Sequence, residues 1–273
     1  MYKNRLFVGK AESVLSEIFP DECVDLTVTS PPYDELRDYK GYTFDFEVIA
    51  GELYRVTAQG GVVVWVVGDT TVKGSETLTS FKQALHFKEI GFNVHDTMIY
   101  EKNGFSYPSS NRYHQVFEYM FVLSKGKPKT FNPIVDRPNK YAGQFCWGKN
   151  TQRQKDGTLV EGHEREVMAE FGMRHNIWRI NTGGNVSTSD KEAFKHPAIF
   201  PEALARDHIL SWTNIGDFVL DPMCGSGTTN KMAVTLGRNT TGIDLSQEYL
   251  DIALSRIKKA KEVRNGGDQL RIL

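Results

Sequence analysis

Short apolar runs alternate with helical patterns over the first 124 residues. The β-branched run at 24–29 is bounded by Pro20-Asp21 and by Pro31-Pro32, which predicts a strand. Residues 61–68 are almost continuously apolar, as expected for a strand covered on both faces of a parallel sheet. Between these runs, apolar residues at spacings of three and four predict a helix over 46–56. Strands that alternate with helices indicate an α/β fold.

The remaining elements continue this alternation. The pattern predicts a helix at about 77–90, strands at about 93–100 and 116–123, a helix at 201–212, a strand at 217–220, a helix at 229–236, a strand at 239–243 and a helix at 247–260. We expect residues 1–124 and 191–273 to form the two halves of one α/β domain. Residues 125–190 are polar, rich in Gly, Asn and Gln, and weakly periodic, so we expect a small loop-rich region there.

The composition is that of an ordinary globular protein. Of the 273 residues, 40% are hydrophobic and 25% are charged. No run of 18 apolar residues would span a membrane, and the first residues lack the apolar core and cleavage site of a signal peptide, so we expect a cytoplasmic protein. The three cysteines are widely spaced, which favours isolated thiols over a zinc site or a disulfide framework.

The charge is distributed less evenly than the net charge of −1 suggests. Between Lys125 and Lys155 there are eight Lys or Arg residues and one acid, Asp136, so this stretch carries +7. Cations interleaved with aromatic residues are typical of contact with nucleic acid, although a solvated loop would explain the charges as well. The candidate contacts are Lys127, Lys129, Arg137, Lys140, Lys149 and Arg153.

A glycine-rich turn between a strand and a helix is the first candidate site. Gly225 and Gly227 allow a positive φ and close approach of the backbone to a ligand. Thr228 and Thr229 would cap the helix whose amide end faces that ligand. Asp244 ends the next predicted strand, where an α/β sheet places a carboxylate that binds the ribose hydroxyls of a nucleotide-like cofactor. The glycine spacing matches neither the dinucleotide nor the triphosphate motif, which disfavours both ligands.

A second candidate turn, Ser30-Pro31-Pro32-Tyr33, directly follows the strand at 24–29. Two prolines fix φ and remove two donors, so the turn is stiff and its carbonyls are acceptors. The exocyclic amine of a nucleobase is a poor nucleophile because its lone pair is delocalised into the ring. A hydroxyl and a main-chain carbonyl that accept both N–H bonds would draw that nitrogen toward tetrahedral geometry, and a nearby ring would stack on an extruded base. Ser30, the Pro31 carbonyl and Tyr33 supply these groups, although a rigid turn with a core tyrosine would use the same residues.

Together, the two turns resemble the motifs of the DNA amino-methyltransferases in the order called the beta class. Thr29-Ser30-Pro31-Pro32-Tyr33 matches the catalytic motif of that family, and residues 221–229 match its cofactor loop. The catalytic motif precedes the cofactor loop, as it does in the beta class. Residues 196–201 and 176–180 are also similar to family segments, so that the resemblance covers most of the chain outside the basic stretch.

The resemblance implies a Rossmann-like methyltransferase fold with a mixed seven-stranded sheet, helices on both faces and a small target-recognition region over 125–190. It implies S-adenosylmethionine as cofactor and no metal. Its catalytic residues would be Ser30, Pro31, Pro32 and Tyr33. Its cofactor-binding residues would be Phe200, Asp221, Met223, Gly225, Ser226, Gly227, Thr228 and Asp244. The cations of the basic stretch would contact DNA.

Two positions depart from the family pattern. The family has an acid after the glycine that precedes the first helix, and this chain has Lys10, with Glu12 two residues later as a substitute. The common phenylalanine of the cofactor loop is Met223, which keeps an apolar and polarisable surface. The first departure leaves open whether this segment contacts the cofactor.

The target base depends largely on Ser30. Family members with Ser at this position mostly modify cytosine at N4, and those with Asp or Asn mostly modify adenine at N6. A hydroxyl accepts from the amine or donates to the ring N3, whereas a carboxylate only accepts. We therefore expect an N4-cytosine methyltransferase, with N6-adenine as the first alternative and a non-catalytic binding protein as the second. The expected partners are double-stranded DNA and a cognate restriction endonuclease, and the expected assembly is a monomer or weak homodimer.

Overall fold

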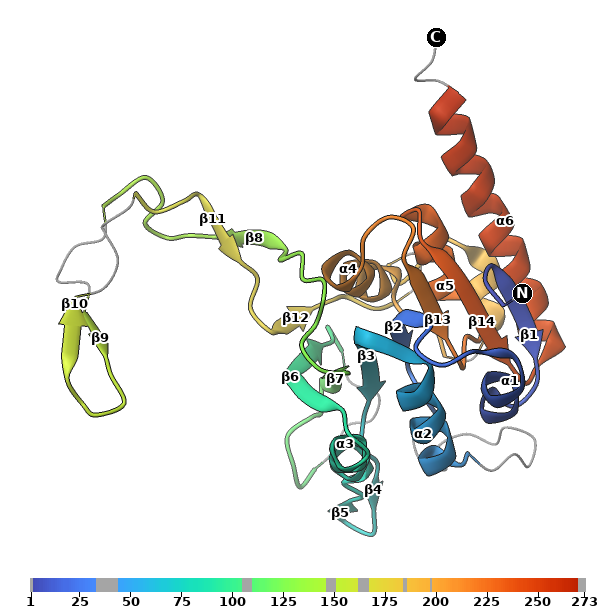
Figure 1. The fold of residues 1–273 in the computed structure, drawn as a ribbon, viewed down its shortest axis with the longest axis horizontal. Helices are drawn as coiled ribbons and strands as arrows, with labels where there is room; N and C mark the ends of the chain where they lie inside the picture. The colour runs from blue at the N-terminus through green and yellow to red at the C-terminus, as the bar shows by residue number, and fades with distance from the viewer. Residues whose placement is uncertain are drawn as a thin grey trace. The chain divides into compact units, whose positions relative to one another are not determined.

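The computed structural model describes residues 2–32, 44–104, 110–145, 151–161, 167–183, 186–196 and 198–269 (Figure 1). The chain divides into two compact units. The larger unit contains Met1–Asn132 and Asn176–Leu273, and the smaller unit contains Pro133–His175. The sequence pattern placed the corresponding boundaries at 125 and 190, so the residues that lead into and out of the smaller unit belong to the larger one.

In the larger unit, the described residues form one mixed sheet of eight strands. Their order is β1 (Arg5–Val8), β14 (Asn239–Asp244), β13 (Phe218–Asp221), β2 (Val24–Thr29), β3 (Thr57–Val67), β7 (Phe117–Ser124), β6 (Asn93–Glu101) and β12 (Ile177–Arg179). β7 runs antiparallel to β3 and β6, and all the other neighbouring strands pair in parallel. The α/β class with a mixed sheet is confirmed. The expected number of seven strands is wrong, since the described residues form eight; β12, at one edge, has only three residues, which are too few to give an alternating pattern.

Helices cover both faces of this sheet (Figure 1). α1 (Ala11–Ile18), α2 (Phe46–Val56) and α3 (Thr79–Glu89) pack on one face, where Val63, Trp65 and Val67 point. Because side chains alternate along a strand, Val62, Val64 and Val66 point to the opposite face. On that face α4 (Glu202–Trp212) and α5 (Thr228–Thr235) pack against the sheet, and α6 (Gln247–Gln269) packs against α5. β3 is therefore buried on both faces, as its apolar run predicted.

The strongest periodic segments have the bounds that the sequence predicts. β2 and α2 coincide with the predicted ranges, residue by residue. α2 begins after Asp45, whose carboxylate accepts from Val48 N at 3.3 Å and so caps the helix. The face that α2 buries consists of Ile49, Ala50, Leu53 and Val56, at the spacings of three and four that predicted the helix.

The connections of the sheet change direction between β13 and β2. From β2 the chain continues through α2 to β3 on one side, and from β13 it continues through α5 to β14 on the other. The two strands pair in parallel, with Leu26 opposite Val219 and Thr27 opposite Leu220. Turns that diverge from two adjacent parallel strands leave a crevice at their carboxyl ends, which is where open α/β sheets bind ligands. Both candidate turns follow these two strands.

The smaller unit contains two antiparallel strand pairs among its described residues. β8 (Val135–Pro138) pairs with β11 (Phe171–Met173), and β9 (Thr151–Arg153) pairs with β10 (Leu159–Glu161). In the larger unit, the remaining short elements are the strand pair β4 (Thr71–Val72) and β5 (Ser75–Glu76) and a 3-10 helix at Lys191–Lys195. Across the described segments, no helix is both long and apolar enough to cross a membrane.

The packing of α2 gives a test of the core. Leu53 is fully buried in α2, whereas Leu85 on α3 is 61% exposed. We expect Leu53→Ala to lower the free energy of unfolding by about 2–5 kcal/mol, because it removes buried methyl groups and leaves a cavity. Leu85→Ala serves as the matched control and should change the same free energy by less than about 0.5 kcal/mol. Urea denaturation followed by circular dichroism measures both, and equal losses would contradict the assigned core.

Candidate functional site

The turns that follow β2 and β13 are joined by buried hydrogen bonds. Thr29 Oγ1 donates to Asp221 Oδ1 at 2.8 Å, and Met223 N donates to the same oxygen at 3.2 Å. Thr229 Oγ1, in the first turn of α5, donates to the Val28 carbonyl at 3.2 Å. The motif expected to do chemistry and the loop expected to bind the cofactor therefore lie side by side, joined by side-chain hydroxyls.

Asp221 lies at the centre of this junction and is only 5% exposed. Burial raises the pKa of its carboxyl from 3.8 to about 6, and the negative charge of Asp244 acts in the same direction. The hydrogen bonds from Thr29 and Met223 favour the carboxylate but do not offset its desolvation. A cation bound beside Asp221 would stabilise the ionised form and lower this pKa.

Asp244 joins the end of β14 to the glycine turn. Its Oδ2 accepts from Gly225 N at 2.8 Å, and its Oδ1 accepts from Ser246 N at 2.9 Å. The turn itself is closed by a bond of 2.7 Å from Gly227 N to the Cys224 carbonyl. A carboxylate oxygen accepts more than one hydrogen bond, so Asp244 keeps acceptor sites for ligand hydroxyls while it positions the turn.

The two glycines of the turn are required by their conformation and by their neighbours. Gly225 has φ +49° and Gly227 has φ +72°, in the left-handed region. A Cβ at Gly227 would lie 2.5 Å from the Cβ of Ala253 on α6, and a Cβ at Gly225 would lie 2.7 Å from His196 Nε2. We expected glycine here to admit a ligand, and the structure shows that it also admits the protein's own side chains.

The predicted capping roles of Thr228 and Thr229 are wrong. The residue before α5 is Gly227, and no side-chain hydrogen bond caps the helix. Thr228 Oγ1 instead accepts from Arg256 Nη1 at 3.1 Å, and Thr229 Oγ1 bonds to the Val28 carbonyl. Both hydroxyls are buried and have partners from other elements, so the amide end of α5 keeps its main-chain donors for other acceptors.

The other predicted site residues differ in burial, and one of them falls outside the part of the chain that the structure describes. Pro31 is buried, and Ser30 and Pro32 are half-buried where the chain leaves β2, whereas Tyr33 lies outside the described residues. Phe200 is half-buried, immediately ahead of Pro201 at the start of α4. Met223 packs against the main apolar core and Ser226 is buried; these two share the cofactor loop.

The candidate DNA contacts belong to both units of the chain. Lys129 forms an ion pair with Asp25, and its N donates to the Gly60 carbonyl at 3.0 Å. Asp25 also accepts from Phe218 N, so this cluster lies at the amino ends of β2 and β13. Asp25 and Ser30 are five residues apart along β2, at about 3.3 Å per residue. The Lys129–Asp25 pair therefore lies roughly 16 Å from Ser30, at the opposite edge of the sheet. Lys127, which is exposed beside Gly60, belongs to the same edge.

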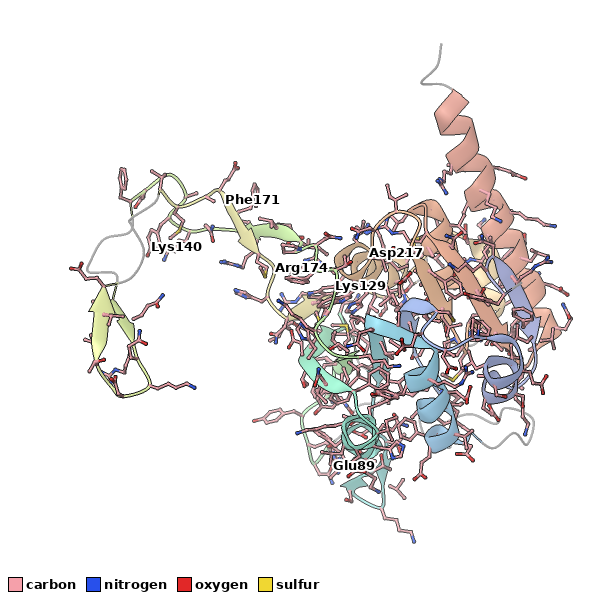
Figure 2. The ribbon with its side chains drawn as sticks, viewed as in Figure 1. Glu89, Lys129, Lys140, Phe171, Arg174 and Asp217 are labelled. Atoms are coloured by element: carbon pink, nitrogen blue, oxygen red, sulfur yellow. The ribbon has the colours of Figure 1, made fainter. Side chains whose placement is uncertain are left out.

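The smaller unit contains the remaining candidates, of which Lys149 lies outside the described residues. Arg137 is partly buried and its Nε donates to the Met173 carbonyl at 3.0 Å, while Lys140 and Arg153 are exposed. Figure 2 labels Lys129 in the larger unit and Lys140 in the smaller one. Residues 133–175 contain seven Lys or Arg and six Asp or Glu, so the unit carries +1. Of the +7 of residues 125–155, +3 comes from Lys125, Lys127 and Lys129 in the larger unit, and residues 156–175 contribute −3.

The sequence pattern did not indicate a polar network beneath the glycine turn. Arg256 on α6 is fully buried and bonds to Ser226, Thr228, Asp190 and Glu202. One signal was present, since Arg256 occupies the face of α6 that is otherwise apolar. Thr29 was part of the matched motif, but nothing in the sequence pointed to its bond with Asp221.

Comparison with known proteins agrees with this arrangement. A family model described as DNA methylase, of the N6/N4 type, matches residues 24–255. The orphan methyltransferase M.BamHII of Bacillus amyloliquefaciens is 60% identical over 244 residues, which cover 89% of this chain and 92% of that protein. The type II methyltransferase M2.LlaDCHI of Lactococcus lactis subsp. cremoris is 32% identical, with 94% and 90% covered.

Solved structures show the same fold. A protein of Thermus thermophilus described as a DNA modification methylase, in complex with S-adenosyl-L-methionine, is 25% identical and superposes with a TM-score of 0.61 over 94% of this chain and 95% of its own. The PvuII DNA methyltransferase, which is cytosine-N4-specific, is 17% identical with a TM-score of 0.66 over 97% and 93%, and shows the fold alone. The paired turns at the ends of β2 and β13 and these matches lead to one conclusion: this chain belongs to the S-adenosylmethionine-dependent DNA methyltransferases of the N4/N6 amino-methyltransferase family.

Proposed function

We propose that this chain transfers the methyl group of S-adenosylmethionine to the N4 amine of cytosine in double-stranded DNA. The observation that carries the proposal is Ser30, which follows β2 directly and lies one residue from the Thr29–Asp221 bond to the cofactor loop. A hydroxyl at this position accepts from the amine or donates to the neighbouring ring nitrogen of cytosine. The N4-specific PvuII enzyme shares the fold, which is compatible with this choice of base.

The proposed chemistry is direct transfer from sulfur to nitrogen. The base is extruded from the duplex, and its amine donates to Ser30 and to the carbonyl of Pro31 while the Tyr33 ring stacks on it. Bound S-adenosylmethionine would supply the methyl group: as the nitrogen lone pair forms a bond to the methyl carbon, the carbon–sulfur bond would break with its electrons staying on sulfur as a neutral thioether, and the nitrogen would lose a proton to water. No covalent bond to the enzyme forms, so the residues act by positioning and by accepting hydrogen bonds.

The cofactor would lie over the glycine turn. We assign the ribose hydroxyls to Asp244, the cationic methionine part to the neighbourhood of Asp221, and an apolar contact to Phe200 and Met223. Buried Asp221 and half-buried Asp244 support these roles, because their carboxylates lie at the carboxyl ends of two neighbouring parallel strands, β13 and β14.

For DNA we propose the smaller unit as the target-recognition region, with Arg137, Lys140, Lys149 and Arg153 as contacts. Its exposed aromatic side chains Tyr141, Phe145 and Phe171 add surfaces for base contact. Lys127 and Lys129 are left out of this set because they lie at the opposite edge of the sheet from Ser30. We propose a monomer or weak homodimer as the active species, and a cognate endonuclease stays an expectation from the resemblance.

Nucleoside analysis tests the target base. The protein is incubated with S-adenosylmethionine that has a labelled methyl group and with unmethylated DNA, and the nucleosides are separated by mass spectrometry. We expect label in N4-methylcytosine, because Ser30 fits the cytosine amine and its ring acceptor. Label in N6-methyladenine would replace cytosine by adenine, the alternative that the family allows, and no label on any DNA would refute methyl transfer to DNA.

Two substitutions separate the catalytic turn from the cofactor turn. Tyr33→Ala should lower kcat by about 10- to 100-fold, because base–aromatic stacking contributes roughly 1–3 kcal/mol, and should leave the cofactor Kd nearly unchanged. Asp244→Asn should instead raise the cofactor Kd by about tenfold, because it weakens bonds to the ribose hydroxyls. Calorimetry and steady-state kinetics measure the two effects. Tyr33→Phe, which keeps the ring, is the control, and an unchanged rate in Tyr33→Ala would refute the stacking role.

The raised pKa of Asp221 predicts how cofactor affinity depends on pH. S-adenosylmethionine has a net charge of +1 between pH 5 and pH 7, and Asp221 becomes a carboxylate as the pH rises through about 6. Cofactor affinity should therefore increase from pH 5 to pH 7, by about tenfold at most, since only the ionised form attracts the cation. Titration calorimetry at pH 5, 6 and 7 measures this. In Asp221→Asn the affinity should no longer depend on pH over this range, and a flat profile in the unmodified protein would contradict the assignment.

A further inference from the structure

Arg256 on α6 is a fully buried charged side chain, and it lies directly behind the glycine turn. Its side chain is 0% exposed. Nη1 donates to the Ser226 carbonyl at 2.6 Å, to Ser226 Oγ at 3.1 Å and to Thr228 Oγ1 at 3.1 Å. Three of its bonds therefore end on two residues of the turn, on the side that faces α6.

Two carboxylates balance the buried charge and fix the direction of the guanidinium. Nε donates to Asp190 Oδ2 at 3.0 Å, and Nη2 donates to Glu202 Oε1 at 3.0 Å. Lys231 Nζ donates to the same two oxygens at 2.8 Å each. Two cations and two anions thus form a neutral cluster, which reduces the cost of burying each charge. Burial would raise the pKa of Asp190, but the bonds from Lys231 and Arg256 outweigh it and lower that pKa below its ordinary value.

The cluster links four segments that meet at the turn. Asp190 precedes the 3-10 helix, Glu202 begins α4, Lys231 lies in α5 and Arg256 lies in α6. One helical turn before Arg256, Ala253 occupies the space that a Cβ at Gly227 would need. α6 therefore contacts the turn through two neighbouring positions on one face, by packing at Ala253 and by directed hydrogen bonds at Arg256.

We propose that Arg256 is a positioning residue for the cofactor, which sets the main-chain geometry of residues 225–228 and so determines affinity for S-adenosylmethionine. Arg256 lies behind the turn and does not touch the reacting atoms. The guanidinium is suited to this role because its planar fork donates in several fixed directions at once, which an ammonium group does not do. The proposal rests on the proposed function, in which the turn binds the cofactor.

The chain provides a matched control in Arg238. This residue is also buried, at 9% exposure, and it also donates to main-chain and hydroxyl oxygens. Nε and Nη2 bond to Thr213 at 3.0 and 2.8 Å, and Nη1 bonds to the Leu236 carbonyl at 2.6 Å. None of these partners belongs to the glycine turn. Arg238→Lys should therefore lower thermal stability as Arg256→Lys does, without the effect on the cofactor.

The experiment compares both variants in the full chain, by calorimetry with S-adenosylmethionine, by steady-state kinetics on DNA and by thermal unfolding. We expect Arg256→Lys to raise the cofactor Kd and KM by about tenfold with kcat changed less than about threefold, because lysine keeps the charge but loses the directed bonds to the turn. Arg238→Lys should lower Tm with an unchanged cofactor Kd. An unchanged Kd in Arg256→Lys, or an equal rise in both variants, would overturn the proposal.

Two further variants keep the test decisive. If Arg256→Lys does not fold, Glu202→Gln is tested in its place, because it weakens one bond that orients the guanidinium. It should also raise the cofactor Kd, by a smaller factor. A folded Glu202→Gln with an unchanged Kd would overturn the proposal. Asp244→Asn reports on the turn itself. If Asp244→Asn raises the cofactor Kd and Arg256→Lys does not, the role of Arg256 is wrong, whereas no effect of Asp244→Asn would refute the cofactor assignment of the turn.

Discussion

The parallel pairing of β2 with β13 is the constraint on which the rest of the site depends. These strands come from distant parts of the sequence, and their connections leave in opposite directions, through α2 and through α5. Both strands end at the same edge of the sheet, so the proline turn after β2 and the glycine turn after β13 become neighbours. The strand pairing alone brings them together. The bond from Thr29 to Asp221 then fixes their relative positions. Such rigidity suits methyl transfer, because donor and acceptor must be aligned before reaction.

The same strand pairing explains how much could be predicted from the sequence. β2 and α2 were located to the residue because β-branched and helical periodicities are local properties, and α/β class followed from their alternation. The carboxyl-end positions of Ser30 and Asp244 followed from strand ends. The bond between Thr29 and Asp221 could not be predicted, since the two residues are 192 positions apart and the sequence between them contains no signal of which strands pair. The capping roles of Thr228 and Thr229 failed for a related reason, because partners from α6 and β2 took their hydroxyls.

Charge was the least dependable guide. A window of 31 residues with a net charge of +7 indicated contact with nucleic acid, but its members belong to two units, and Lys125 and Lys129 form ion pairs with Glu22 and Asp25. Ion pairs depend on distance in space, and sequence windows measure only distance along the chain. Phosphate contacts must therefore be inferred from cations that stay exposed and lie outside such pairs. In the smaller unit, exposed Lys140 and Arg153 fit that description better than Arg137, which is partly buried and donates to the Met173 carbonyl.

Arg256 shows what a periodic pattern can and cannot reveal. Along α6, Leu250, Ala253, Ile257 and Ala260 form the buried face, and Arg256 falls on that face. A charged residue at such a position must find both a counter-charge and acceptors, or the helix would not pack. The sequence could therefore have indicated that α6 buries a polar interaction, although it could not indicate with which segment. In the fold that segment is the glycine turn, where Ala253 occupies the space beside Gly227 and Arg256 donates to Ser226 and Thr228.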